Sequence, residues 1–233
     1  SSSKKNVSSS SQKPESSSSI KKDSSSSEII NIDAEFVKIG NQEWMTTNLN
    51  VDVTGSSCYE DKPEFCEKYG RLYTWSMAMG IDTSYDKKMY GKTTEPHQGI
   101  CPDGSHLPSH DEWNLLNEFI KKNPEYVKYF QNQYGGAYDY HGYYRDVGTE
   151  VTFISSTEYD VSGTSHPYEF TWLWYIHDNQ SNLNKDNGHK YTGAYVRCVK
   201  GEIPPSTVPS SSSQNSSSSL ALSSSSNAAP VLE

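Results

Sequence analysis

Apolar side chains recur at helical spacing in the middle of the chain, in the run that opens with CPDGSHLPSHDEW. The positions that share one helical face are Trp113, Leu116 and Ile120. Ser109 can cap the first turn, and Glu112, three residues later, completes a capping box. The sequence therefore predicts an amphipathic helix that begins after Ser109 and ends at Asn123.

A second, shorter helix is expected in the run YGRLYTWSMAMG, which spans residues 69–80. Leu72, Trp75 and Met79 share a helical face there, and Gly80 is a natural residue to end the helix. Two helices combined with short strands predict an α+β domain with long loops.

Period-two alternation bounded by turn residues predicts the strands. They are expected at residues 36–39, 42–45, 151–154, 170–177 and 191–200. Gly40 and Asn41 join the first two strands and suit a type II′ hairpin turn. The glycine- and tyrosine-rich stretch 131–149 has no period and is predicted to be a surface loop, and 178–190 is predicted to be an Asn/Asp-rich turn.

The strand predicted at 170–177 is informative because alternate side chains of a strand point to opposite faces. One face would carry Trp172, Trp174 and Ile176, and the other Leu173, Tyr175 and His177. Large aromatic side chains are mostly buried in folded domains, so we expect the tryptophan face to pack into the core.

Composition divides the chain into three parts. Residues 1–30 are dominated by serine and residues 202–233 are rich in serine and proline, whereas all 17 Tyr, 5 Trp and 6 Phe lie between them. Segments so poor in apolar side chains cannot bury enough surface to offset the entropy of ordering. We therefore expect one folded domain at 31–201, flanked by two disordered linkers.

The net charge of −9 belongs to the domain, because the five lysines of the first tail balance the acidic residues of both tails. An acidic surface argues against nucleic acid and anionic membranes as partners. No apolar run is long enough to span a bilayer, so no transmembrane segment is expected.

Four cysteines in a loop-rich acidic domain indicate two disulfides and an oxidising, extracytoplasmic setting. Of the three possible pairings we expect Cys58–Cys66, which closes a short polar loop, and Cys101–Cys198, which would join the capped helix to the last strand. A zinc site and a catalytic thiol are the alternatives. The chain has no CxxC pair for zinc and no lone cysteine beside a visible base.

Two groups of polar residues raise the question of a metal site. His106 and His110 lie four apart, but Pro108 between them breaks a shared helical turn, so loop and surface histidines are expected. An oxygen-rich loop that could hold Ca²⁺ contains Asp178, Asn182, Asn184 and Asp186. Its spacing is not that of an EF-hand. We expect no cofactor, with calcium as the open alternative.

No pattern typical of catalysis stands out. The run Ser155-Ser156-Thr157 lacks the G-x-S-x-G elbow of a hydrolase, and no phosphate-cradling glycine loop is present. We therefore expect that the domain is not an enzyme.

The remaining signal is a set of aromatic residues in polar, loop-like sequence. Tyrosine offers a large apolar face and a hydrogen-bonding tip at low entropy cost, which suits polar ligands such as sugars. We expect about half of the loop tyrosines to anchor loops in the core instead. The predicted ligand-binding residues are Tyr138, Tyr140, Tyr143, Tyr144, Tyr159, Tyr175, His177, Asp178 and Asn182.

Five blocks, in this order, resemble the Fibrobacter succinogenes major paralogous domain: FVKIGNQEWMTTNLN, YGRLYTWSMAM, CPDGSHLPSHDEW, ISSTEYD and GAYVRCVK. They extend over nearly all of residues 34–200. Ser105 and Ile154 stand where the family usually has tryptophan, and both departures concern packing. More distantly, LPSHDEW and the closing VRC resemble the formylglycine-generating enzyme family and its C-type-lectin-like fold.

The resemblance implies export, often as a lipoprotein on a serine-rich stalk, so we expect a cell-surface or secreted domain. It implies a C-type-lectin-like scaffold without the enzyme's chemistry, because no cysteine pair lies between Cys101 and Cys198. We therefore expect a monomeric, non-catalytic binding module that presents an aromatic loop face to a carbohydrate such as a plant cell-wall polysaccharide. The alternative is a structural or protein-interaction domain of the bacterial envelope with no sugar ligand.

Overall fold

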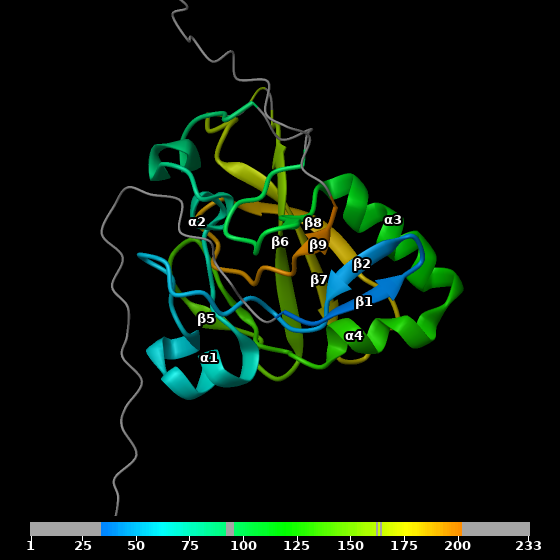
Figure 1. Ribbon diagram of the computed structural model, residues 1–233. Helices are drawn as coiled ribbons and strands as arrows, with labels where there is room; N and C mark the ends of the chain where they lie inside the picture. Colours follow the sequence, from blue (N-terminus) through cyan, green and yellow to red (C-terminus); the bar gives the residue numbers. More distant parts are fainter. Residues whose placement is uncertain (1–33, 92–95, 162, 164, 202–233) are drawn as a thin grey trace, which may run out of the picture.

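The computed structural model describes residues 34–91, 96–161, 163 and 165–201. The linkers predicted at 1–30 and 202–233 lie outside these residues. The described chain forms a mixed α+β domain with antiparallel sheets and a few helices (Figure 1). No helix within the described ranges is long and apolar enough to cross a membrane.

The four α-helices of the described residues differ widely in length. Helices α1 to α4 span Pro63–Tyr69, Trp75–Met79, His110–Lys122 and Lys128–Gln131, and short 3-10 helices span Tyr59–Asp61, Thr83–Asp86 and Pro124–Val127. Helix α3 is the predicted amphipathic helix, and Ser109 and Glu112 form its capping box.

The prediction of one helix over residues 69–80 was wrong in its first half. Leu72 pairs with Ser57 and Tyr73 with Ala194 in single β-bridges, so this stretch is extended and helical structure begins only at α2. Gly80 ends α2 in the left-handed conformation, as its lack of a side chain allows.

The strands form three separate antiparallel groups. Strands β1 (Phe36–Ile39), β2 (Gln42–Met45), β3 (Ser105–His106) and β9 (Val199–Lys200) make a sheet in the order β1-β2-β9-β3. The hairpin β4–β5 pairs Ala137–Tyr138 with Tyr144–Arg145. The longest strands, β6 (Glu150–Tyr159), β7 (Phe170–His177) and β8 (Asn184–His189), make a sheet in the order β6-β7-β8.

The first hairpin and β7 have the predicted bounds, and Gly40 takes a positive φ of 62° in the hairpin turn. The predicted turn at 178–190 instead contains β8, and the predicted loop at 131–149 contains the hairpin β4–β5. The predicted strand at 191–200 is regular only in β9, because residues before it make isolated bridges to different partners.

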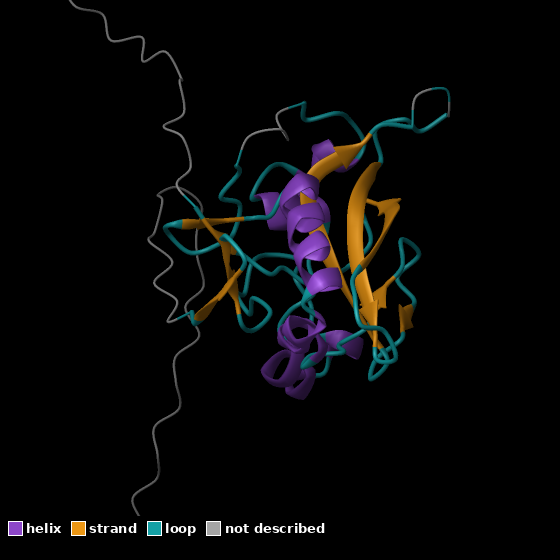
Figure 2. Ribbon diagram, turned by 90° about the vertical axis from the view of Figure 1, so that its right-hand side faces the viewer, coloured by secondary structure: helices purple, strands orange, loops and turns teal. Residues whose placement is uncertain are grey.

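Helix α3 lies between the hairpin β1–β2 and the β6–β7–β8 sheet (Figure 2). Trp113 on α3 contacts Trp44 of β2 at a ring-centroid distance of 4.6 Å and Trp174 of β7 at 6.1 Å. All three rings are fully buried, so the core that holds the sheet to the helix is largely aromatic.

The face of the β6–β7–β8 sheet that points away from α3 has two parts. At one part, Ile154 and Leu173 pack into a second buried cluster that includes Trp75 and Met79 of α2. The other part, toward the N-terminal end of β6, carries Glu150 and Thr152, which face the β4–β5 hairpin across a groove. Alternation along β6 and β7 therefore gives one sheet a core face and a partly accessible face.

Both predicted disulfides are present. Cys58–Cys66 closes the loop that leads into α1, and Cys101–Cys198 joins the segment before α3 to the chain just before β9. Two disulfides suggest an extracytoplasmic domain, because thiols in reducing compartments seldom stay oxidised.

Candidate functional site

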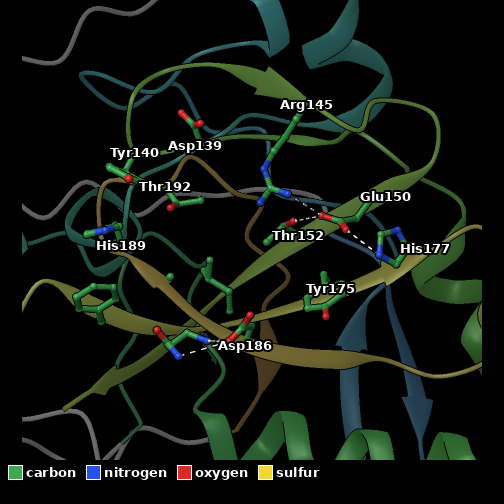
Figure 3. Close-up of a pocket in the computed structure, with 14 residues that line it drawn as sticks. Asp139, Tyr140, Arg145, Glu150, Thr152, Tyr175, His177, Asp186, His189 and Thr192 are labelled. Atoms are coloured by element: carbon green, nitrogen blue, oxygen red, sulfur yellow. Dashed lines mark hydrogen bonds and ion pairs between the residues drawn. The ribbon is translucent and has the colours of Figure 1, made fainter. Parts of the chain in front are cut away.

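A groove of about 500 Å³ opens on the accessible face of the β6–β7–β8 sheet (Figure 3). Alternate side chains of β6 and β7 form its floor, β8 borders it from Asp186 to His189, and the β4–β5 hairpin and the chain after β8 form its walls. The groove runs from His177 at one end to Tyr140 and His189 at the other.

The carboxylate of Glu150 lies at the His177 end of the groove, and its side chain is only 6% exposed. Its Oε1 accepts a hydrogen bond from the Thr152 hydroxyl at 2.8 Å and lies 3.8 Å from Nη1 of Arg145. Its Oε2 lies 3.1 Å from Nε2 of His177, which is the cross-strand partner of Glu150 between β6 and β7. Buried carboxylates require such partners, and these hold Glu150 in one orientation.

Aromatic rings form the other end of the groove. Tyr140 and His189 have ring centroids 4.1 Å apart, and Phe170 lies 4.3 Å beyond His189. Burial lowers the pKa of His189. Glu169 opposes this effect, and the nearby His166 and His141 add smaller effects that lower the pKa. The ring of His189 is therefore neutral at pH 7 and offers an apolar face.

Two more carboxylates border the groove. Backbone N–H groups of Tyr143 and His141 donate to Asp139, which lowers the pKa of that carboxyl, and they fix the loop between β4 and β5. Asp186 on β8 accepts a hydrogen bond from the backbone N–H of Asn187 at 2.8 Å. Carboxylate, amide, guanidinium and imidazole groups thus share the groove with the apolar side chain of Leu173 and the aromatic rings.

The arrangement can hydrogen-bond a ligand that carries many hydroxyl groups. Arg145 and His177 can donate, Asp139 and Asp186 can accept, and Asn187 can do both. Over the described part of the chain, no group of three or more His, Cys, Asp or Glu side chains could hold a metal ion.

A family model described as the Fibrobacter succinogenes major domain matches residues 37–200, which is most of the chain. The chain belongs to this family. No curated protein and no solved structure matches it. The family match confirms the resemblance that the five sequence blocks indicated.

In this Fibrobacter succinogenes major domain, the groove brings together three of the nine predicted ligand-binding residues, namely Tyr140, Tyr175 and His177. Tyr175 and His177 follow the predicted alternation of β7, with Trp174 buried on the other face. Burial raises the pKa of Tyr175, and the nearby Asp186 and Glu150 raise it further. The phenol is therefore neutral at pH 7 and can both donate and accept a hydrogen bond.

Two of the nine, Tyr138 and Tyr144, anchor the β4–β5 hairpin. The Tyr144 ring packs against Tyr59 at 4.9 Å and against Tyr138 at 5.8 Å. The Tyr138 ring fills the space beside Gly193, and burial raises its pKa to about 12. These residues position the hairpin wall and do not line the groove.

The other four predicted residues lie outside the groove lining. Tyr143 is 73% exposed, and Tyr159 packs edge-on against Trp172 at 4.7 Å. Asp178 is exposed, and the Asn182 amide donates to the carbonyl of Leu183.

The groove residues that the sequence did not predict include Asp139, Arg145, Glu150, Thr152, Asp186 and His189. Extending the alternation of β7 to a paired strand at 150–154 would have placed Glu150 and Thr152 beside Tyr175 and His177. No local signal marks Arg145 or His189, because Arg145 reaches the groove from the β4–β5 hairpin and His189 from β8, which pairs along β7.

The structure also shows where the two groups of residues considered as metal sites in the sequence lie. His106 contacts Oε1 of Glu112 at 2.7 Å, whereas the His110 ring stacks on Trp172 at 4.0 Å, so the two histidines serve different contacts. In the oxygen-rich loop, the Asn182 and Asn184 amides donate to Leu183 and Gln180, and Asp186 borders the groove.

Proposed function

We propose that the domain is a non-catalytic, extracytoplasmic module that binds carbohydrate in the groove over the β6–β7–β8 sheet. The observation that carries the proposal is the combination, in one groove of about 500 Å³, of aromatic rings with fixed polar groups of several kinds. That volume lies within the range of small-molecule binding sites.

Sugar rings have apolar C–H faces and polar hydroxyl edges. Tyr140 and Phe170 supply aromatic faces at one end, and Glu150, Arg145 and His177 supply hydrogen-bonding groups at the other. Tyrosine suits such ligands because its ring loses little conformational entropy and its hydroxyl remains available.

The proposal includes a C-type-lectin-like scaffold, as the distant sequence resemblance implies. The mixed α+β architecture and the Cys101–Cys198 disulfide support it. Display on the cell surface or secretion, including attachment as a lipoprotein, is part of the same proposal, and the two disulfides support it.

Binding to plant cell-wall polysaccharides can be measured by isothermal titration with soluble xylan and β-glucan fragments and by pull-down on insoluble polysaccharide. Tyr175→Ala, in the groove floor, should weaken binding at least ten-fold. Tyr143→Ala is the matched control, because this tyrosine is exposed and does not line the groove. Absence of glycan binding by the unaltered, folded chain would refute the proposal.

A protein partner in the bacterial envelope is the second candidate function. Tyr143, Tyr140 and Tyr168 are large aromatic side chains with substantial exposure, and aromatic residues are enriched at protein interfaces. Cross-linking in an envelope extract distinguishes the two functions, because this candidate predicts a protein partner whose capture is unaffected by competing sugars.

A further inference from the structure

A second hollow adjoins the groove. It has a volume of about 600 Å³ and shares Tyr140 and His189 with the groove, while His166, Glu169 and Tyr191 belong to it alone. The two hollows therefore meet at Tyr140 and His189, whose rings are in contact.

The rings at this junction form a continuous row. Ring centroids are 3.9 Å apart between His141 and Tyr140, 4.1 Å between Tyr140 and His189, and 4.3 Å between His189 and Phe170. Tyr140 is half exposed, so part of its ring remains accessible at the point where one hollow passes into the other. A ligand that occupies both hollows must cross this row.

Permanent charges in the combined site are mostly negative. Four carboxylates, those of Asp139, Glu150, Glu169 and Asp186, line the two hollows together with two permanent cations, Arg145 and Lys87. Arg145 is already paired, since its Nη1 lies 3.0 Å from Asp146 and 3.8 Å from Glu150. A ligand with its own carboxylates would meet this uncompensated negative charge.

We propose that the two hollows form one elongated site for a linear oligosaccharide that carries no carboxylates, with a sugar unit seated at Tyr140 between them. This inference rests on the proposed carbohydrate function and adds the length and charge of the ligand. Affinity should rise with chain length until both hollows are filled, by roughly ten-fold for a further unit that contacts an aromatic ring.

The length of the ligand can be tested by titrating the full chain with xylo-oligosaccharides of two, four and six units. Affinity should rise from the shortest to the longest. His166→Ala, which alters only the second hollow and replaces an exposed side chain, should reduce the gain from two to six units and leave binding of the disaccharide unchanged. Equal affinity for all lengths would overturn the elongated site while leaving carbohydrate binding intact.

The charge of the ligand can be tested with oligogalacturonates of the same lengths. They should bind at least about five-fold more weakly than the uncharged chains at low salt, and the difference should shrink at high salt. Glu169→Gln should reduce the discrimination for six units but not for two, because Glu169 lines the second hollow alone. Equal or tighter binding of the uronates would overturn the charge preference, and failure of every glycan to bind would refute the carbohydrate function itself.

Discussion

Arg197 donates two hydrogen bonds to one acceptor, the side-chain oxygen of Asn48, through Nε at 3.0 Å and Nη2 at 2.6 Å. Its guanidinium is fully buried, and Nη1 donates to the carbonyls of Met45 and Tyr129 at 3.1 and 2.9 Å. These acceptors are all uncharged. Burial lowers the pKa of Arg197 to about 9, so the side chain is still cationic at pH 7.

Arg197 joins the chain just before β9 to the segment after β2 and to α4, so its replacement should be strongly destabilising. Arg197→Lys keeps the charge but cannot reproduce the fork of donors, and we expect a loss of about 2–4 kcal/mol in the free energy of unfolding. Urea denaturation measures this loss. Arg71→Lys is the control, since Arg71 forms a partly exposed pair with Asp52 and should change stability by less than about 1 kcal/mol.

Removing the two disulfides should have unequal effects. The cysteines of Cys101–Cys198 are 97 residues apart and those of Cys58–Cys66 are 8 apart. In the chain-entropy model, the double replacement of Cys101 and Cys198 by alanine costs about 4–5 kcal/mol, and that of Cys58 and Cys66 about 2–3 kcal/mol. Thermal denaturation of both variants checks the order, and a larger loss from the short loop would contradict the model.

Elements with strong local signals could be predicted from the sequence. The capping box of Ser109 and Glu112, the Gly40 turn and the alternation of β7 each depend on residues close together in the chain, and all three are present. By contrast, β8 has the polar sequence NKDNGH and forms a strand because it pairs along β7. Pairing between separate segments leaves little trace in the local pattern.

The same limit applies to the groove. Tyr175 and His177 could be placed on one face by alternation alone, whereas Glu150 reaches His177 only through the register between β6 and β7. The loop tyrosines look alike in sequence, yet the Tyr138 ring packs beside Gly193 and against Tyr144, whereas Tyr140 lies in the turn of the hairpin and is half exposed. This difference depends on where the hairpin lies against the rest of the fold.

His110 should make stability fall at mildly acidic pH. Burial, together with the nearby Lys185 ammonium 3.4 Å from Nε2, lowers the pKa of His110 to about 4, against a smaller opposing effect of Asp111. The unfolded chain takes up this proton near pH 6.5, before the folded one does. The stability contributed by the neutral ring is therefore complete above pH 6.5 and decreases as the pH falls toward 4.

The ring is partly accessible to solvent, so this loss should be roughly 1–2 kcal/mol. His110→Phe keeps an aromatic ring against Trp172 and should remove this part of the pH dependence. Lys185→Met should raise the pKa of His110 in an NMR titration. A His110 resonance that titrates above pH 6 in the unaltered domain would contradict the prediction.

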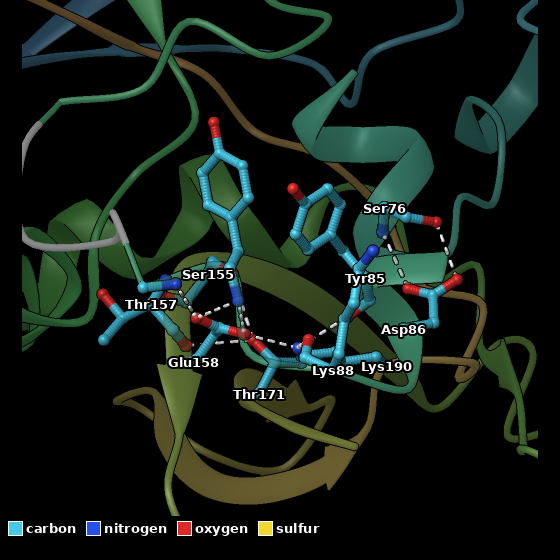
Figure 4. Close-up of polar contacts among 11 residues, drawn as sticks. Ser76, Tyr85, Asp86, Lys88, Ser155, Thr157, Glu158, Thr171 and Lys190 are labelled. Atoms are coloured by element: carbon cyan, nitrogen blue, oxygen red, sulfur yellow. Dashed lines mark hydrogen bonds and ion pairs between the residues drawn. The ribbon is translucent and has the colours of Figure 1, made fainter. Parts of the chain in front are cut away.

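The buried ion pair of Lys190 and Glu158 should be the most sensitive charged contact of the domain (Figure 4). The Lys190 ammonium is fully buried, donates to Oε1 of Glu158 at 2.5 Å and to the carbonyls of Tyr85 and Lys88, and lies 4.3 Å from the Trp75 ring centroid.

Glu158→Gln would leave this buried cation without its counter-charge, which costs about 3–5 kcal/mol. The double variant Lys190→Met with Glu158→Gln should lose less free energy of unfolding than Glu158→Gln alone, because no unpaired charge remains. The exposed pair of Lys200 and Glu43 is the control, and Glu43→Gln should change stability by less than about 1 kcal/mol. Urea denaturation of these variants gives the coupling energy between Lys190 and Glu158. A change below about 1 kcal/mol in the free energy of unfolding for Glu158→Gln would show that the pair does not hold the segment after α2 against β6.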